Sequence, residues 1–382
     1  REKGAAGVIA GLENLEKLGE AARARHTGKR IGVTGSVGKT GTKELLATAF
    51  AALGSTHASA ASFNNHIGVP LTLARMPRDT QYGVFEMGMN HAGELRELSR
   101  MVQPDVALIT WIAEAHLEHF GTMDAIADAK SEIFEGMARG KVAVLPIDNP
   151  HYERLFRAAR HNHLDVLPFG VDPGALACMV NCQPLDNGVN VTVDIDGIGI
   201  KYFMPLQGLH VAKNSVGALA AVHAAGGDVK LAAAALEHAQ AAPGRGQVFR
   251  LGGILILDES YNANPESMRA TLTTLAAMPC HGRRIAVLGD MFELGDTSPA
   301  LHAQLADTIK SLPIEQVITC GDMMKNLSKA LPDDQRGPHY DSSWQLADDI
   351  ANLLRAEDCV LIKGSNGMKM KTVLAAIRST FV

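Results

Sequence analysis

The sequence predicts an α/β protein with two units, each built on a mostly parallel sheet. Short apolar runs alternate with helical stretches from residue 28 to 241, and a second alternating series fills residues 242–382. Such alternation is typical of parallel sheets, because the crossover helices cover both faces. At 382 residues the chain also exceeds what one hydrophobic core usually serves. We therefore expect two main domains, preceded by a short segment over residues 1–27.

The first unit begins after a predicted helix over residues 11–26. The segment TGK at 27–29 ends this helix, and Ile31 to Val33 start an apolar strand. Further strands are predicted over GVFEMG (83–88), VALITWI (106–112), VAVLPI (142–147) and LDVLPFG (164–170). Helices are predicted over residues 38–53, 123–138 and 212–225. Period-two alternation over 189–206 instead predicts a small antiparallel part.

The second unit follows the segment AAPGRGQ at 241–247, where Gly and Pro are concentrated. Its strands are predicted over ILILDES (254–260), RIAVLGD (284–290), QVITCGD (316–322) and CVLIKGS (359–365). Each strand ends in a polar or Gly-containing turn. In a doubly wound sheet ligands bind at these strand ends, so the unit is expected to be a Rossmann-like α/β domain that contributes to a site.

Composition excludes several classes of protein. No apolar run reaches the roughly 18 residues that span a bilayer, and the N-terminal residues lack the pattern of a secretory signal. A formal net charge of −5 offers no field to attract nucleic acid. The five cysteines have no paired metal-site spacing and are expected to be buried free thiols. We expect a cytoplasmic protein.

The segment IGVTGSVGKTGTK at 31–43 contains the strongest local signal. An apolar strand runs into a glycine-containing loop and then into a helix, so backbone amides and the helix dipole can face phosphate oxygens. Lys39 offers a charge and Thr40 a hydroxyl for magnesium. The loop is therefore predicted to bind nucleotide phosphates, and the first unit to be a P-loop-type domain, through Thr34, Gly35, Ser36, Val37, Gly38, Lys39 and Thr40.

This loop does not by itself choose among kinase, hydrolase, motor and ligase. The form TGSVGKT resembles the ATP loop of the Mur ligase family, and further segments resemble that family in order over about residues 28–376. SFNNHIGVPL at 62–71 is similar to the family's Asn-Asn segment, which implies that Asn64 and Asn65 lie on the substrate and phosphate side. Asparagines before a helix are also common as caps, and the residues alone leave that alternative open.

The resemblance also implies the metal-binding and catalytic residues. Glu86 ends an apolar strand, where an oxygen ligand can meet the metal of the nucleotide. In the family this Glu and Thr40 hold magnesium, the counterpart of His116 faces a second magnesium ion, and the counterpart of Lys130 is carbamylated. GLHVAKN at 208–214 is similar to the family's GxHxxxN element, which implies that Asn214 reaches the adenine.

The second unit supplies the rest of the resemblance. Arg245 matches the family's arginine that reaches the ATP phosphates when the domains close, a role that suits its planar fork. DESYNANP at 258–265 is similar to the branch that adds a D-alanyl-D-alanine dipeptide. It implies a nucleotide role for Glu259, where the wider family has Asp, and substrate roles for Tyr261, Asn262, Asn264 and Lys363.

The chain departs from the family at several positions. Trp111 and Ala113 stand where the family commonly has Asn and Gly, and Val211 stands where many members have a second Asn. Asn366 and Lys371 replace an Arg and a Glu. Residues 1–27 leave room only for a remnant of the family's N-terminal domain, which binds the UDP part of the substrate.

The resemblance implies an ATP-dependent, ADP-forming ligase that joins D-alanyl-D-alanine to UDP-N-acetylmuramoyl-tripeptide in peptidoglycan precursor synthesis. It implies an acyl phosphate intermediate, two magnesium ions and action as a monomer. One alternative is another Mur-type or a folylpolyglutamate-type amide ligase, against which YNANP and NNHIGVP speak. Another is a non-catalytic nucleotide-binding scaffold, which would not need Glu86, His116, Lys130 and Arg245 together.

Overall fold

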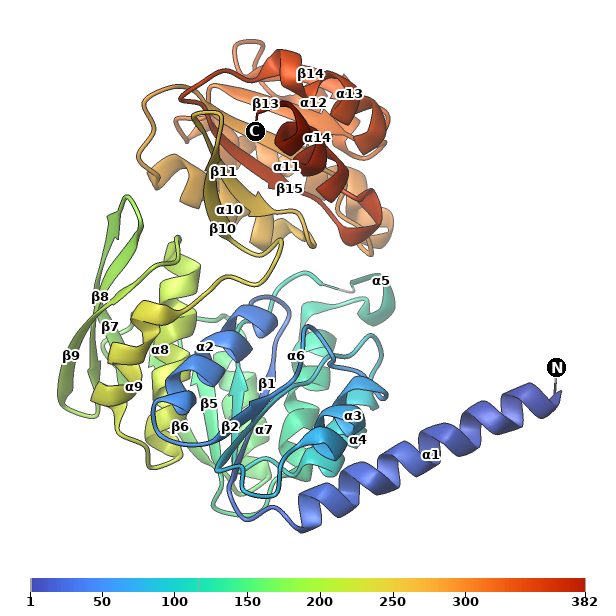
Figure 1. The fold of residues 1–382 in the computed structure, drawn as a ribbon, viewed down its shortest axis with the longest axis vertical. Helices are drawn as coiled ribbons and strands as arrows, with labels where there is room; N and C mark the ends of the chain where they lie inside the picture. Colours follow the sequence, from blue (N-terminus) through green and yellow to red (C-terminus); the bar gives the residue numbers. More distant parts are fainter. Residues whose placement is uncertain (1, 116, 382) are drawn as a thin grey trace.

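The computed structural model describes the backbone of residues 2–115 and 117–381, and the side chains from residue 10 onward within those ranges. Two α/β units lie one above the other, with the C-terminal unit at the top of Figure 1. Each unit has its own sheet, one of nine strands and one of six. The predicted fold class is confirmed.

The larger sheet has the strand order β2-β3-β1-β4-β5-β6-β7-β8-β9. Strands β1 to β7 pair in parallel, and β7, β8 and β9 pair antiparallel. The strands are β1 (Lys29–Thr34), β2 (Thr56–Ala58), β3 (Tyr82–Glu86), β4 (Val106–Ile109), β5 (Val142–Pro146), β6 (Asp165–Gly170), β7 (Ala177–Leu185), β8 (Gly188–Ile195) and β9 (Ile198–Met204).

Helices cover both faces of this sheet because its strand residues alternate between two apolar cores. Val106 and Leu108 of β4 face one core, and Ala107 and Ile109 face the other. Helices α2, α8 and α9 pack on the first face and α3, α4, α6 and α7 on the second. The helices are α1 (Glu2–Ala24), α2 (Lys39–Ala51), α3 (Gly68–Arg75), α4 (Glu94–Val102), α5 (Leu117–Phe120), α6 (Met123–Ser131), η1 (Glu132–Gly136), α7 (Tyr152–His161), α8 (Leu209–Ala224), α9 (Val229–Ala235) and η2 (Leu236–His238).

The smaller sheet has the order β10-β11-β15-β12-β13-β14, and only β10 is antiparallel to its neighbour. Helices α10, α11 and α12 pack on one face, and α13 and α14 on the other. The elements are β10 (Gln247–Leu251), β11 (Ile254–Glu259), α10 (Pro265–Ala277), β12 (Arg284–Gly289), η3 (Gly295–Thr297), α11 (Ser298–Lys310), β13 (Gln316–Cys320), α12 (Met324–Ala330), β14 (Arg336–Tyr340), α13 (Ser343–Leu353), β15 (Cys359–Lys363), η4 (Asn366–Met368) and α14 (Lys371–Thr380).

Several elements differ from the sequence prediction. The helix predicted over 123–138 changes to a 3-10 helix at Glu132. Strands β2, β7, β10 and β14 were not predicted. Three of them, β2, β10 and β14, lie at sheet edges, and their residues are only partly buried or exposed. A half-exposed strand lacks the continuous apolar run that identifies a central parallel strand.

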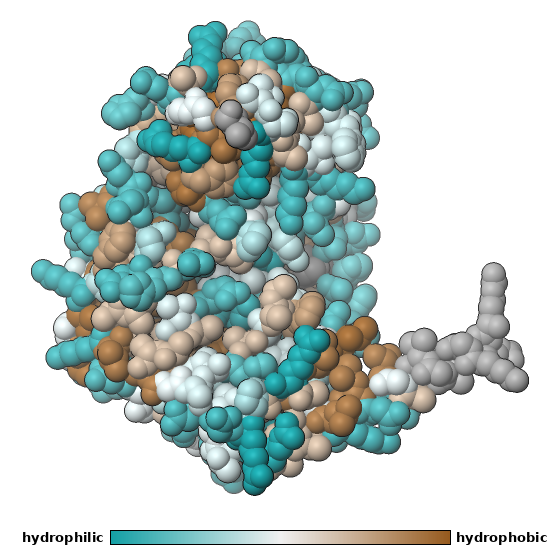
Figure 2. All heavy atoms as spheres, in the orientation of Figure 1, coloured by the Kyte–Doolittle hydropathy of each residue, from teal (hydrophilic) through white to brown (hydrophobic). Residues whose placement is uncertain are grey.

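Helix α1 extends away from the larger unit in Figure 1, with its C-terminal part against α3. Figure 2 shows mostly polar side chains over the visible face, with an apolar patch where α1 leaves the body. Within the described ranges, no helix is both long enough and apolar enough to cross a membrane. All five cysteines are free thiols, as predicted, but only Cys320 and Cys359 are buried. The expected burial is wrong for Cys178, Cys182 and Cys280, which are half-buried.

Candidate active site

A cavity of about 880 Å³ lies between the two units and is lined by residues of both. From the larger sheet it receives residues that follow the carboxyl ends of β1, β3, β4 and β5. From the smaller sheet it receives the ends of β11 and β15, at Glu259 and Lys363. Ligands bind at this edge of open parallel sheets, so the topology itself directs both units at one site.

The loop between β1 and α2 adopts a backbone that requires glycine at two positions. Gly35 has φ +147° and Gly38 has φ +82°, and α2 begins at Lys39. A Cβ on Gly35 would lie 2.0 Å from Oγ1 of Thr110. The backbone N–H of Ser36 donates to the carbonyl of Trp111 at 2.7 Å. The loop is thus held against the end of β4 with the N-terminus of α2 open to the cavity, which suits an anion.

Lys39 folds back over this loop. Its Nζ donates to the carbonyl of Gly35 at 2.7 Å. Burial lowers the pKa of the Lys39 ammonium, the charge of Glu86 raises it, and the charge of Arg245 lowers it. A phosphate between Lys39 and Arg245 would relieve the repulsion between these cations, because it supplies the opposite charge to both.

Glu86 ends β3 with a buried side chain, 1% exposed. Its Oε1 accepts from Nδ2 of Asn64 at 2.7 Å, and its Oε2 has no hydrogen-bond partner among the described residues. Thr40, in the first turn of α2, is also buried and shares a hydrogen bond of 3.2 Å with Ser62 Oγ. A carboxylate oxygen without a partner and a hydroxyl line the same cavity. Both are oxygen donors of the kind that magnesium prefers, so these residues fit a bound magnesium ion.

Lys130 lies on α6 and is fully buried. No described residue hydrogen-bonds to its Nζ. Burial lowers the pKa of Lys130 well below its usual value, the charge of Lys39 lowers it further, and Glu132 and Glu94 partly oppose this. A buried ammonium without a partner is costly, so burial favours the neutral amine form of this side chain.

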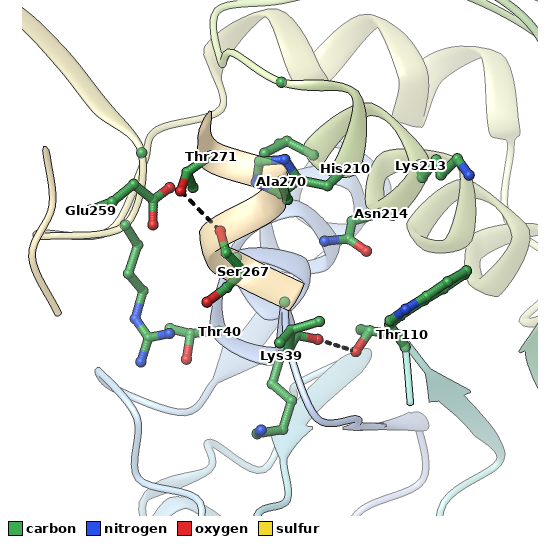
Figure 3. Close-up of a pocket in the computed structure, with 18 of the residues that line it drawn as sticks. Lys39, Thr40, Thr110, His210, Lys213, Asn214, Glu259, Ser267, Ala270 and Thr271 are labelled. Atoms are coloured by element: carbon green, nitrogen blue, oxygen red, sulfur yellow. Dashed lines mark hydrogen bonds between the residues drawn. The ribbon is translucent and has the colours of Figure 1, made fainter. Parts of the chain in front are cut away.

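Asn214 lies next to the phosphate loop, on the side opposite Thr40. Asn214 lies on α8 over Gly38, where a Cβ would be 2.7 Å from Asn214 Nδ2. In Figure 3, Asn214, Lys213 and Thr110 lie on one side of Lys39, and Thr40 and Glu259 lie on the other. The loop therefore separates two chemically different ends of the cavity.

Arg245 brings the second unit into contact with the first. It sits between Gly244 (φ +74°) and Gly246 (φ +90°), and its Nη2 donates to Ser62 Oγ at 3.1 Å. Its guanidinium carbon lies 3.8 Å from the ring centroid of Tyr261, a cation–π contact. The stacked ring fixes the guanidinium plane and leaves its charge at the mouth of the phosphate loop.

Lys363, at the end of β15, is nearly fully buried. Its Nζ donates to the carbonyl of Asn262 at 3.0 Å and lies 3.4 Å from Glu259 Oε2. Burial lowers the pKa of Lys363, and the charge of Glu259 opposes that shift. Burial also lowers the pKa of the neighbouring His210, and the charge of Glu259 opposes that shift. The pair of Lys363 and Glu259 orders the loop that carries Asn262.

Two of the asparagines are occupied as structural groups. Oδ1 of Asn65 accepts from the backbone N–H of Ile67 and of Gly68. Asn264 is the N-cap of α10, where its Oδ1 accepts from Ser267 N at 2.8 Å in a capping box. Asn65 therefore accepts from free N–H groups at the start of α3, a structural use that its position before a helix also allowed.

The structure gathers most of the predicted site residues around the cavity. Those that line it are Ser36, Val37, Gly38, Lys39, Thr40, Asn64, Glu86, Asn214, Arg245, Glu259, Tyr261, Asn262, Asn264 and Lys363. Thr34, Gly35, Asn65 and Lys130 are outside its lining. His116 lies outside the described residues.

Sequence reasoning missed residues that connect the units. Ser62 joins Thr40 to Arg245, and Nη2 of Arg269 lies 3.2 Å from Oε2 of Glu114 in the larger unit. Ser62 adjoins the Asn pair, which was a usable signal. A cross-unit pair such as Arg269 and Glu114 has no sequence signal, because its partners are 155 residues apart.

Comparison with known proteins identifies relatives along the whole chain. The description "Mur ligase middle domain" matches residues 33–222, and "Mur ligase, glutamate ligase domain" matches residues 244–366. The chain is 32% identical to the UDP-N-acetylmuramoyl-tripeptide–D-alanyl-D-alanine ligase of Rickettsia prowazekii, covering 95% of this chain and 81% of that protein.

Solved structures agree with these matches. A crystal structure of MurF from Acinetobacter baumannii superimposes with a TM-score of 0.89 at 30% identity, covering 97% of this chain and 81% of that one. MurF of Thermotoga maritima in complex with ADP superimposes with a TM-score of 0.85 at 25% identity, covering 97% of this chain and 84% of that one.

Proposed function

This chain belongs to the Mur ligase family, and we propose on that basis that it joins D-alanyl-D-alanine to UDP-N-acetylmuramoyl-tripeptide with hydrolysis of ATP to ADP and phosphate. Relatives of this name match more than nine-tenths of the chain. The reaction serves peptidoglycan precursor synthesis. The other amide ligases and the nucleotide-binding scaffold are not favoured, because neither explains that match.

One observation carries the proposal: Arg245 of the second unit reaches Ser62 beside the phosphate loop of the first. A ligase must activate a carboxylate and then admit an amine. Its site therefore needs phosphate-binding groups on one unit and acceptor-binding groups on another, around a shared cavity. Lys39 of the phosphate loop lines the cavity from the first unit, and Arg245, Tyr261 and Lys363 line it from the second, which supports this division. We place the domain boundaries at residues 27/28 and 241/242.

The chemistry follows in two steps. The substrate carboxylate attacks the γ-phosphorus of ATP and ADP leaves, which forms an acyl phosphate. The amine of D-alanyl-D-alanine then attacks the acyl carbon, and phosphate leaves. Lys39 and Arg245 stabilise charge on the transferring phosphoryl group. Asn214 serves the base end of the nucleotide, Glu259 the nucleotide side of the second unit, and Asn64, Tyr261, Asn262 and Lys363 the acceptor substrates.

Thr40 and Glu86 would hold magnesium, with His116 at a second ion. Magnesium bound there would neutralise phosphate charge and fix the oxygens in line. Lys130 is included as a carbamate, since its neutral buried amine can add carbon dioxide and become an anion in reach of metals. The pKa shift and the missing partner of its Nζ support that role.

The location and assembly belong to the same proposal. We place the protein in the cytoplasm, where ATP is available, and infer that it acts as a monomer. A single copy suffices for catalysis because both halves of the cavity wall come from one chain.

The test is product formation. Phosphate release from ATP with magnesium is measured with both acceptors, with each alone and with neither, and the UDP-linked pentapeptide is identified by mass. Product that requires both acceptors is expected. Product from glutamate in place of the dipeptide would indicate another amide ligase. ATP binding with no acceptor-dependent phosphate release would indicate a scaffold.

A further inference from the structure

Trp111 lies beside the phosphate loop, to which its backbone is hydrogen-bonded. It directly follows Thr110 at the end of β4, lines the cavity and is only partly buried. Its backbone carbonyl accepts from Ser36 N at 2.7 Å. The backbone of Trp111 therefore supports the phosphate loop, and the indole of the same residue is adjacent to that contact.

The two sides of the loop differ in what they can bind. Thr40 lies on one side of Lys39 in Figure 3 and is joined through Ser62 to Arg245, so this side carries charge and oxygen donors for phosphate and metal. The other side carries an aromatic ring and the Asn214 amide, which lies directly over Gly38. If the triphosphate of a nucleotide binds to the loop, its base lies at the opposite end of the nucleotide. A flat, uncharged base is suited to the side of the loop that carries Trp111 and Asn214.

The indole is also held in position. Nζ of Lys213 lies 5.7 Å from the ring centroid of Trp111, and the same Nζ forms an ion pair with Asp148 at 3.1 Å. Lys213 is one residue before Asn214 on α8, and Asp148 follows β5, so three separate elements meet at this ring. A ring restrained before binding loses little freedom when a base stacks on it.

We propose that Trp111 is the stacking platform for the nucleotide base, fixed by the Lys213–Asp148 pair, and that it determines the preference of this chain for a nucleotide over a bare triphosphate. The inference rests on the proposed use of ATP. Stacking on an aromatic side chain tolerates different bases but requires a base. Purines, with the larger ring system, should therefore bind more tightly than pyrimidines.

The first test compares ATP with inorganic tripolyphosphate by calorimetry, using the full chain in the presence of magnesium. Trp111→Ala should raise the Kd for ATP about tenfold or more and leave the Kd for tripolyphosphate unchanged. Trp111→Phe, which keeps a ring, should stay within about threefold of the unmodified chain. Trp344→Phe is the matched control, since Trp344 is 61% exposed on α13.

The outcomes distinguish failure of the Trp111 stacking role from failure of the proposed ATP-dependent function. An unchanged Kd for ATP in Trp111→Ala would overturn the stacking role. Equal weakening of ATP and tripolyphosphate would also overturn it, because the loop itself would then be damaged. If the unmodified chain bound no ATP, the proposed function would fail and this inference with it. Thermal melting identifies variants that do not fold, and the fluorescence of Trp111 in the folded Trp344→Phe variant then decides.

Fluorescence provides a second, direct readout. The chain contains two tryptophans, so Trp344→Phe leaves Trp111 as the only indole. ATP, GTP and the nucleoside adenosine should quench its emission, and tripolyphosphate should not. Quenching by tripolyphosphate equal to that by ATP would overturn the proposal.

Discussion

At the scale of single residues, the site contains buried polar groups that the fold leaves without partners. Glu86 Oε2, Lys130 Nζ and the hydroxyls of Thr34 and Ser36 have no hydrogen-bond partner among the described residues. Such groups destabilise a folded chain unless a ligand satisfies them. Of these, Glu86 and Ser36 line the cavity, where a bound ligand can satisfy them. Thr34 and Lys130 lie outside its lining.

Glu86→Gln tests the metal role of that carboxylate. The amide can keep a hydrogen bond with Asn64 but loses the charge that attracts magnesium. The magnesium concentration for half-maximal phosphate release should rise about tenfold or more. The control is Glu135→Gln, which removes a more exposed carboxylate from η1. An unchanged magnesium requirement in Glu86→Gln would contradict the assignment.

His302 makes the stability of the second unit depend on pH. It is fully buried, its Nε2 accepts from Met291 N at 2.9 Å, and its Nδ1 donates to the carbonyl of Ser298 at 2.7 Å. Burial lowers its pKa below 6.5. Because the unfolded chain takes up the proton more readily, stability is full above about pH 6.5 and falls as pH drops through the lower folded pKa.

Urea unfolding at pH 8 and pH 5 measures this effect. The unmodified chain should lose stability on acidification, and His302→Gln should lose less, although it starts from a lower value. Equal losses in both proteins would assign the pH dependence to other groups.

At the scale of elements, one side chain fixes the start of α10 and the loop before it. Asn264 caps the helix, while Tyr261 and Asn262 in the same loop line the cavity. Asn264 was predicted to bind substrate, and the cap is a second, structural use of the same side chain.

Replacing Asn264 by Ala and by Asp separates these uses. Asn264→Ala should lower the free energy of unfolding by about 1 kcal/mol, because the cap is lost. Asn264→Asp keeps the capping oxygen and should retain stability. If Asn264→Asp also retained the KM for D-alanyl-D-alanine, the residue would act through the cap alone. Chemical unfolding and steady-state kinetics give the two readouts.

How far the sequence predicts the elements depends on burial. Central strands such as β1 and β15 are continuous apolar runs and were predicted, and so was the phosphate loop between β1 and α2. Edge strands such as β2 and β14 expose part of each residue and carry no such run. The contacts of Arg245 with Ser62 and of Lys213 with Trp111 join distant segments, so no local pattern could predict them.

At the scale of the whole molecule, the two units meet through a few polar contacts around the cavity. Arg245 contacts Ser62, and Arg269 forms an ion pair with Glu114. Interfaces of this polar kind permit the units to move relative to each other. We therefore expect catalysis to depend on the arrangement in which Arg245 reaches Ser62 beside the loop.

Arg245→Ala tests that dependence. Acceptor-dependent phosphate release should fall about 100-fold or more, because a charge that acts on the transferring phosphoryl group is removed. The melting temperature should change little, since the Arg245 side chain bridges the two units and is absent from the apolar cores of either unit. Arg250→Ala, on β10 and exposed, is the matched control. Full activity in Arg245→Ala would defeat the closure argument.

The hydroxyl of Ser62 stands between Thr40 of one unit and Arg245 of the other. A ligand that captures Thr40 must share or displace Ser62, and so it alters the contact that holds the second unit. Loading of the phosphate loop and closure of the units are therefore thermodynamically linked. By reciprocity, the factor by which closure raises nucleotide affinity equals the factor by which bound nucleotide shifts the equilibrium toward closure. One serine hydroxyl couples the two events.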